Sequence, residues 1–74
     1  MNKTFKIGEY AIGGLINVQN KGKLIRIEAQ DWEDKTPILT GYYSKEDKNG
    51  LMNFLNELTS YYHAEKIFNY IHKK

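Results

Sequence analysis

Cysteine is absent from this sequence of 74 residues, and its absence excludes disulfides, thiolate metal sites and thiol nucleophiles together. A chain without disulfides suits a reducing compartment. Long apolar runs are also lacking, since no stretch approaches the roughly 20 apolar residues of a membrane span. The N-terminus has no apolar segment typical of a signal peptide. We therefore expect a cytoplasmic protein that does not insert into membranes.

A strong excess of either charge is missing as well. Eleven basic and nine acidic residues give a net charge of +2, and Arg26 is the only arginine. A dedicated nucleic-acid binder usually carries a denser basic stripe, so this charge permits nucleic acid without favouring it. The length predicts one domain, residues 1–74, with a single small core. Aromatic residues make up 14% of the chain, and tyrosine, the commonest of them, is frequent at binding surfaces.

Residues 14–29 carry the clearest structural pattern, which predicts a β-hairpin. Five apolar residues alternate with polar neighbours on its two arms: Ile16, Val18, Ile25, Ile27 and Ala29. Pairing Ile16 with Ile27 places all five on one face and makes Lys21–Gly22 the two-residue tip. We expect this face to form the core of the fold.

Strands are also predicted on both sides of the hairpin. Residues 4–7 alternate weakly and form a short first strand. Residues 38–43 follow Pro37, which has no N–H for a strand ladder and therefore opens a strand. Their pattern does not decide which face is buried. The polar segment 31–36 between the last two strands is typical of a solvated turn.

The C-terminal part predicts helix, starting either at a capping box at Ser44 or at Asn49. Two apolar stripes follow, which point in different directions at about 100° per residue: Leu51, Leu55, Leu58 and Tyr62, then Ala64, Ile67, Phe68 and Ile71. A straight helix cannot bury both against one sheet, so we favour two segments, with Ser60 capping the second. The prediction is an α+β fold: a small antiparallel β-meander of three to four strands with a C-terminal helix or two helical segments.

No residue pattern specifies an enzyme or a metal centre. The glycines of 8–14 are not followed by the helix start and Lys-Ser/Thr of a phosphate loop. The acidic residues of 31–34 lack the spacing and glycine of a calcium loop. His63 and His72 lie outside any zinc-binding pattern. We therefore predict no catalytic residue, no metal ligand and no cofactor, and a protein that is not an enzyme.

The second face of the hairpin is the predicted partner-binding surface, because arginine and tryptophan often anchor interfaces. Its candidate residues are Leu15, Lys21, Lys23, Leu24, Arg26 and Trp32. The alternative is that the second helical segment covers this face and makes it ordinary core. An exposed second face would also permit a homodimer, so the sequence leaves monomer and homodimer open.

Nucleic acid is the alternative partner. The same sheet offers Tyr10, Trp32, Tyr42 and Tyr43 as stacking platforms, with lysines to reach phosphates. The pattern of an RNA-recognition sheet is missing, and the acidic turn 31–34 would repel phosphate. A larger protein is therefore the favoured partner, and RNA or single-stranded nucleic acid the second choice.

The N-terminal octapeptide Met1–Gly8, Met-Asn-Lys-Thr-Phe-Lys-Ile-Gly, resembles the start of small phage-type anti-CRISPR proteins that inhibit type II-C systems. It departs from that pattern at Phe5, where the family has a tyrosine. The resemblance implies a small, cofactor-free inhibitor from a phage or other mobile element that blocks a CRISPR effector by occupying its surface. No functional residue of the family carries over to this chain.

Overall fold

The computed structural model describes residues 2–73, so Met1 of the octapeptide and Lys74 lie outside the described residues. Four strands come first: β1 (Asn2–Lys6), β2 (Gly14–Lys21), β3 (Leu24–Asp31) and β4 (Pro37–Ser44), with the short 3-10 helix η1 (Gly8–Tyr10) between β1 and β2. Two helices follow, α1 (Lys48–Leu58) and α2 (Tyr61–Ile71). The strands form one antiparallel sheet in the order β1-β2-β3-β4. The predicted α+β fold is confirmed, with four strands and two helices.

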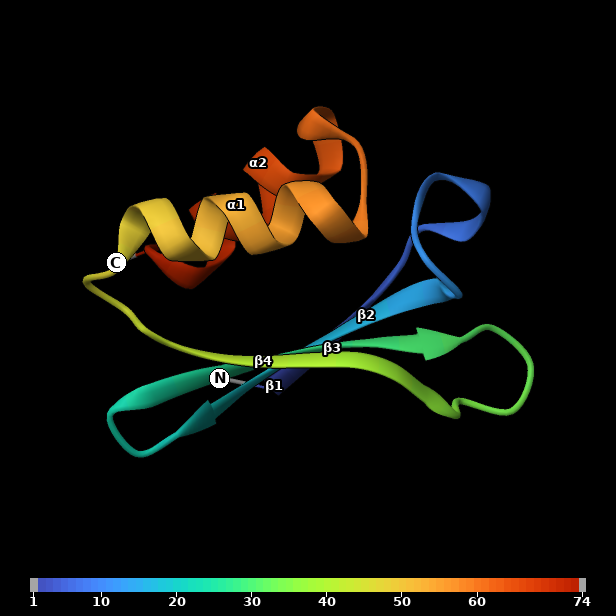
Figure 1. Cartoon of the computed structure of the whole chain (residues 1–74), viewed down its shortest axis with the longest axis horizontal. Helices are drawn as coiled ribbons and strands as arrows, with labels where there is room; N and C mark the ends of the chain where they lie inside the picture. Colours follow the sequence, from blue (N-terminus) through green and yellow to red (C-terminus); the bar gives the residue numbers. More distant parts are fainter. Residues whose placement is uncertain (1, 74) are drawn as a thin grey trace.

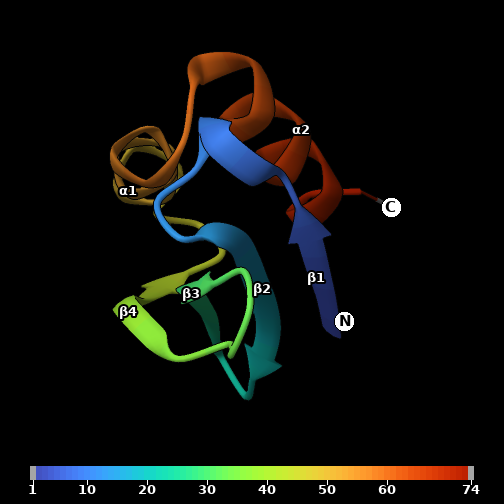
Figure 2. The ribbon, with the colours of Figure 1, turned by 90° about the vertical axis from the view of Figure 1, so that its right-hand side faces the viewer.

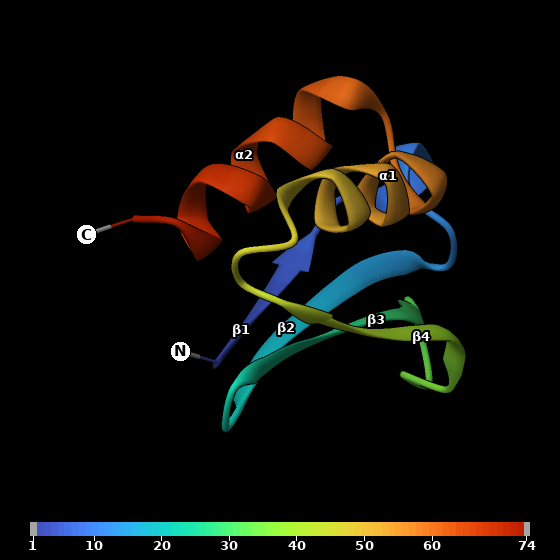
Figure 3. The same ribbon diagram turned by 60° about the vertical axis from the view of Figure 1, so that its left-hand side comes forward.

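Both helices lie on the same face of the sheet (Figures 1 and 3). The two predicted stripes meet there, because buried residues of α1 and of α2 join one core with the inward side chains of the hairpin. Ile16, Ile27 and Ile67 are each at most 1% exposed in that core. None of the helices in the described residues is long and apolar enough to cross a membrane.

The predicted hairpin register is wrong by two residues. Ile16 lies opposite Ala29 and Val18 opposite Ile27, so the tip is Gly22–Lys23. Gly22 has a φ of +65°, and a glycine with positive φ at the first tip position is typical of a type II′ turn, which suits the twist of paired strands. Because side chains alternate with a period of two, this shift leaves the same five apolar residues inside.

The break between the helices is fixed by the segment around η1. Thr59 is extended and forms an isolated bridge with Ala11. The Ile12 N–H donates to the Leu58 carbonyl at 2.8 Å, and the Thr59 hydroxyl donates to the Tyr10 carbonyl at 2.5 Å. The segment therefore supplies a hydrogen-bond donor to the Leu58 carbonyl at the end of α1. The chain turns at Thr59, and α2 packs on the same face of the sheet.

Two predictions about helix starts are wrong in detail. Ser60 holds the N-cap position of α2, but its hydroxyl contacts His63 Nδ1 at 3.0 Å and caps no backbone N–H. Ser44 ends β4, so a helix start there is wrong, whereas the alternative start at Asn49 is one residue from the observed one. The helix α1 begins at Lys48, and its cap Asp47 accepts from the Gly50 N–H at 3.0 Å. A Cβ on Gly50 would lie 2.3 Å from a carboxylate oxygen of Asp47, so glycine here makes room for the cap.

Ile27→Ala tests the core. Removing this fully buried side chain should lower the free energy of unfolding by about 2–5 kcal/mol, because it leaves a cavity beneath both helices. Ile38→Ala is the matched control, since Ile38 is 48% exposed and should lose about 0.5 kcal/mol or little more. Urea unfolding gives both values, and equal losses would contradict the assignment of faces.

Candidate functional site

The open face is the side of the sheet opposite the helices. Its outward side chains are Thr4 and Lys6 from β1, Leu15, Asn17 and Gln19 from β2, Leu24, Arg26, Glu28 and Gln30 from β3, and Thr40 and Tyr42 from β4. They alternate with the core residues, and no helix lies on this side in Figure 2. The alternative that the second helical segment covers this face is therefore wrong.

A buried carboxylate lies at the centre of the open face. Glu28 has a side chain only 5% exposed, and it accepts hydrogen bonds from Gln30 Nε2 and Thr40 Oγ1, each at 2.8 Å. Arg26 Nη2 pairs with the same carboxylate. Burying a carboxylate without hydrogen-bond partners would lower the free energy of unfolding. The three donors from β3 and β4 offset this cost and stabilise the charged form of Glu28.

The pKa of Glu28 reflects the same contacts. Burial by itself would raise the pKa of this carboxyl, since it disfavours the charged form. The hydrogen bonds from Gln30 and Thr40, together with the positive charge of Arg26, outweigh burial and lower the pKa below its ordinary value of 4.5. Glu28 is therefore ionised at neutral pH and holds Arg26 by charge as well as by hydrogen bonding.

Arg26 is fixed but still able to bind. Its side chain is 21% exposed, and besides Glu28 only Gln19 Oε1, at 3.5 Å, accepts a hydrogen bond from it among residues 2–73. A guanidinium has five N–H donors, so further donors are left for a partner. The planar group suits a carboxylate or a backbone carbonyl of a protein as well as a phosphate.

Exposed apolar side chains flank Arg26. Tyr42 lies directly opposite it on β4 and is 55% exposed. Leu24, two residues earlier on the same face, is 40% exposed. An arginine held rigid between a tyrosine and a leucine has the composition of an interface centre, where desolvated aromatic and arginine anchors contribute most of the binding free energy.

The six predicted site residues do not form one cluster. Lys21 and Lys23 are exposed at the hairpin tip, beside Leu24 and Arg26. Leu15 is on the open face but only 3% exposed, so its side chain offers almost no surface to a partner. Trp32 is half-exposed just beyond Asp31, which lies five residues and about 17 Å along the strand from Arg26.

Trp32 has a structural role at its own end of the sheet. A Cβ on Gly14 would lie 3.0 Å from the indole ring, so the ring lies against the glycine backbone. Gly14 also has a φ of +101°, which few other residues adopt. The glycine pair at the start of β2 thus bends the chain and makes room for Trp32.

Tyr42, Glu28 and Thr40 belong to the centre of the open face, but Tyr42 was predicted only as a stacking platform for nucleic acid, and Glu28 and Thr40 were not predicted as site residues. The missing information was the pairing of β3 with β4, which places Tyr42 opposite Arg26 and Thr40 opposite Glu28. Alternation within 38–43 could have given two possible faces, and only the partner strand chooses between them.

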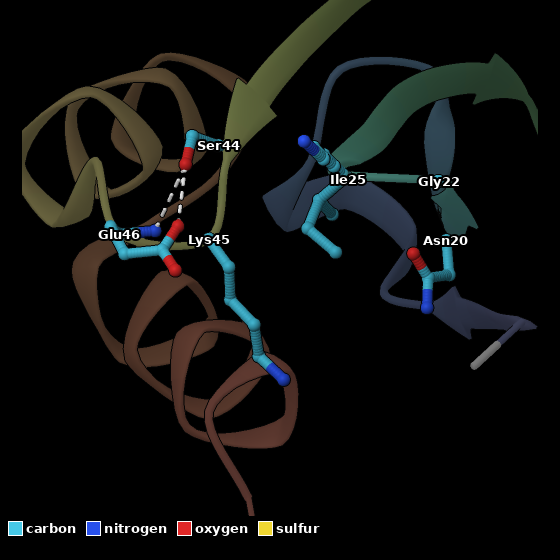
Figure 4. Close-up of a pocket in the computed structure, with 7 residues that line it drawn as sticks. Asn20, Gly22, Ile25, Ser44, Lys45 and Glu46 are labelled. Atoms are coloured by element: carbon cyan, nitrogen blue, oxygen red, sulfur yellow. Dashed lines mark hydrogen bonds between the residues drawn. The ribbon is translucent and has the colours of Figure 1, made fainter.

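A hollow of about 360 Å³ lies between the hairpin tip and the segment joining β4 to α1 (Figure 4). Its lining residues are Asn20, Gly22, Lys23, Ile25, Ser44, Lys45 and Glu46. The Ser44 hydroxyl donates to Glu46 at 2.6 Å, and this bond lowers the pKa of the Glu46 carboxyl. His72 lies beside this hollow, but its Nε2 contacts the Lys45 carbonyl at 2.8 Å and the Ser44 hydroxyl is bonded to Glu46, so these residues do not have the arrangement of a hydrolytic triad.

A second exposed surface, the aromatic corner, lies where η1 meets the start of α2. Tyr10, Tyr61 and Tyr62 are each at least 60% exposed there. His63 stacks on Tyr10 at 5.8 Å between ring centroids and meets Tyr62 edge-on at 5.1 Å. Tyr70, by contrast, is half-buried against Phe5. These residues come from distant parts of the chain, so the sequence alone did not bring them together.

Within residues 2–73, no three histidine, aspartate or glutamate side chains are placed to hold a metal ion. Comparison with protein-family models, with curated proteins and with solved structures gives no match for this chain. Function therefore has to be argued from the open face itself.

Glu28→Gln tests the network through the pH dependence of stability. Because the folded state lowers the pKa of Glu28, its stabilising effect is fully present above about pH 4.5 and is lost as the pH falls through the lowered pKa. The difference in unfolding free energy between wild type and variant should be largest near pH 7 and should shrink towards pH 3. Glu65→Gln, on the exposed surface of α2, is the control. A difference that stays constant over this range would contradict the network.

Proposed function

We propose that this chain is a small non-enzymatic binding protein whose open face docks on a larger protein. The observation that supports this proposal is Arg26, held by the buried Glu28 carboxylate between exposed Leu24 and Tyr42. A preorganised arginine loses little entropy on binding, and its apolar neighbours supply area that a partner can desolvate. Lys21 and Lys23 at the hairpin tip form the charged rim of this surface.

Protein is favoured over nucleic acid by the charges of the open face. The charge of Arg26 is balanced by Glu28, and the end of β3 and the turn after it carry the acidic Asp31, Glu33 and Asp34. Phosphate binding needs several uncompensated cations along one track. Exposed Tyr42 beside the tip lysines keeps RNA or single-stranded nucleic acid as the alternative, since a base can stack on a tyrosine.

The partner we propose is an effector protein of a CRISPR system, and the chain an anti-CRISPR-like inhibitor from a phage or other mobile element, acting in the cytoplasm. The support is the octapeptide resemblance, together with a binding face on a domain whose residue pattern specifies no chemistry of its own. In this proposal, inhibition follows from covering a surface that the effector needs for its substrate or for its movement.

The first experiment identifies the partner. The whole chain is used as bait in lysate of a host cell that carries a type II-C system, with and without nuclease treatment. A retained protein that survives nuclease supports the proposal, and the same protein should then be inhibited by the purified chain. Loss of all retention after nuclease supports the nucleic-acid alternative instead.

Arg26→Ala then tests the anchor. Affinity for the partner should fall by about 2 kcal/mol, roughly thirtyfold, because a central desolvated contact is lost. Lys21→Ala and Lys23→Ala should change affinity much less at the solvent-exposed rim. Titration calorimetry at two salt concentrations measures this, and circular dichroism confirms that each variant is folded.

Two results would overturn the proposed site. Wild-type affinity of a folded Arg26→Ala variant would show that the open face is not the interface, and the aromatic corner would be examined next. Equal losses at Arg26, Lys21 and Lys23 with a steep dependence on salt, about one unit of slope per phosphate, would indicate nucleic acid.

A further inference from the structure

The two edges of the sheet, β1 and β4, differ in how well they are protected against pairing with a further strand. β1 is five residues long and carries Lys3 and Lys6, and short charged edges resist pairing with other strands. β4 is eight residues long and carries no charge. Pro37 and an irregularity at Ile38 interrupt only its beginning, and Leu39–Ser44 pair regularly with β3. The other side of this segment is a free strand edge (Figure 2).

β4 also exposes apolar side chains on both faces of the sheet. Leu39 lies opposite Ala29 on the helix face and is 40% exposed, and Tyr42 on the open face is 55% exposed. A long, uncharged edge with exposed apolar residues is a template for another strand. An added strand would pair the free N–H and C=O groups of the edge and cover part of both side chains.

We propose that the strand that pairs with β4 is β4 of a second copy of this chain. The two strands would run antiparallel about a two-fold axis at Gly41, joining two sheets into one of eight strands. Residues facing each other across an antiparallel pair share a face, so Thr40 meets Tyr42 on the open face and Leu39 meets Tyr43 on the helix face. This inference does not rest on the proposed function, although Tyr42 belongs to both surfaces.

A second copy fits because β4 is complementary to itself. A two-fold interface brings the same strand together from both copies, so a strand with charges of one sign would meet like charges in its copy, whereas β4 carries no charge. The register at Gly41 gives two pairs of a β-branched residue with an aromatic one and two aliphatic–aromatic pairs. Such cross-strand pairs are among those that stabilise sheets.

Gly41, the residue on the proposed axis, has no room for a side chain within its own chain. A Cβ at this residue would lie 2.8 Å from the Tyr43 ring and 3.0 Å from the Phe54 ring, which fill the space above it. These two rings pack together at 5.3 Å between centroids. In the proposed dimer Leu39 of each copy approaches this aromatic pair of the other, which explains how a leucine left 40% exposed in the single chain becomes covered.

The first test is the mass of the whole chain in solution. Sedimentation equilibrium should show a concentration-dependent rise from 8.7 kDa to twice that mass. Leu39→Lys should weaken dimerisation by about tenfold or more, because it places a charge beside the paired edge. Leu24→Lys is the matched control, since Leu24 is equally exposed but lies on the inner strand β3, and it should dimerise like wild type.

Cross-linking tests the register, and the lack of cysteine in the chain makes it specific. Chains with Thr40→Cys mixed with chains with Tyr42→Cys should form a disulfide, since directly opposed residues lie about 4.5–5.5 Å apart. Either variant alone should cross-link far less. A chain that stays at 8.7 kDa up to millimolar concentration, or cross-links no better in the mixture, would overturn the proposal. If a monomeric chain instead lost its protein partner on Leu39→Lys, the occupant of β4 would be a strand of that partner.

Discussion

The extended residue Thr59 decides how this small domain is assembled. Its bridge to Ala11 and its bond to the Tyr10 carbonyl break what would otherwise be one long helix. Without the break, the apolar stripes of α1 and α2 would point in different directions, and only one could reach the sheet. With it, Leu55 and Ile67 enter the same core over Ile16 and Ile27, where all four are at most 1% exposed. A domain of 74 residues has little apolar surface to spare, so this shared core accounts for most of its stability.

The use of both helices on one face leaves the other face of the sheet uncovered. The buried Glu28 carboxylate on that face is satisfied by donors from two strands, whereas Oδ1 of the neighbouring Asn17 has no hydrogen-bond partner among the described residues. The same contacts immobilise Arg26 at the surface. The proposed interaction site therefore rests on the same contacts that stabilise the uncovered face, and exposed Leu24 and Tyr42 would supply its apolar part.

Much of this architecture could be predicted from the sequence, for local reasons. Alternation of Ile16, Val18, Ile25 and Ile27 fixes which side of the hairpin is buried, and the change of stripe direction near Thr59 predicts two helices. The exact pairing of β2 with β3 did not follow from the alternation, since two registers that differ by two residues bury the same side chains. The positive φ of Gly22, at the first position of the turn, distinguishes the observed register from the predicted one.

The site was less predictable because it depends on contacts between strands. Arg26 and Leu24 were predicted from their alternation with the core residues, but the position of Tyr42 beside them depends on the pairing of β4 with β3. Trp32 was grouped with them from proximity in sequence, although a strand of this length carries it to the other end of the sheet. The aromatic corner unites Tyr10 with His63 through the fold alone.

We propose that the open face, and not the helical side, meets the partner. Cross-saturation NMR on the complex tests it most directly, with the isotope-labelled chain bound to its unlabelled partner. Saturation of the partner should transfer to the methyl groups of Leu24 and Thr40 and to the ring of Tyr42, while Ile12 and the ring of Tyr61 stay unaffected. Transfer to Ile12 and Tyr61 with none to Leu24 or Tyr42 would contradict the account.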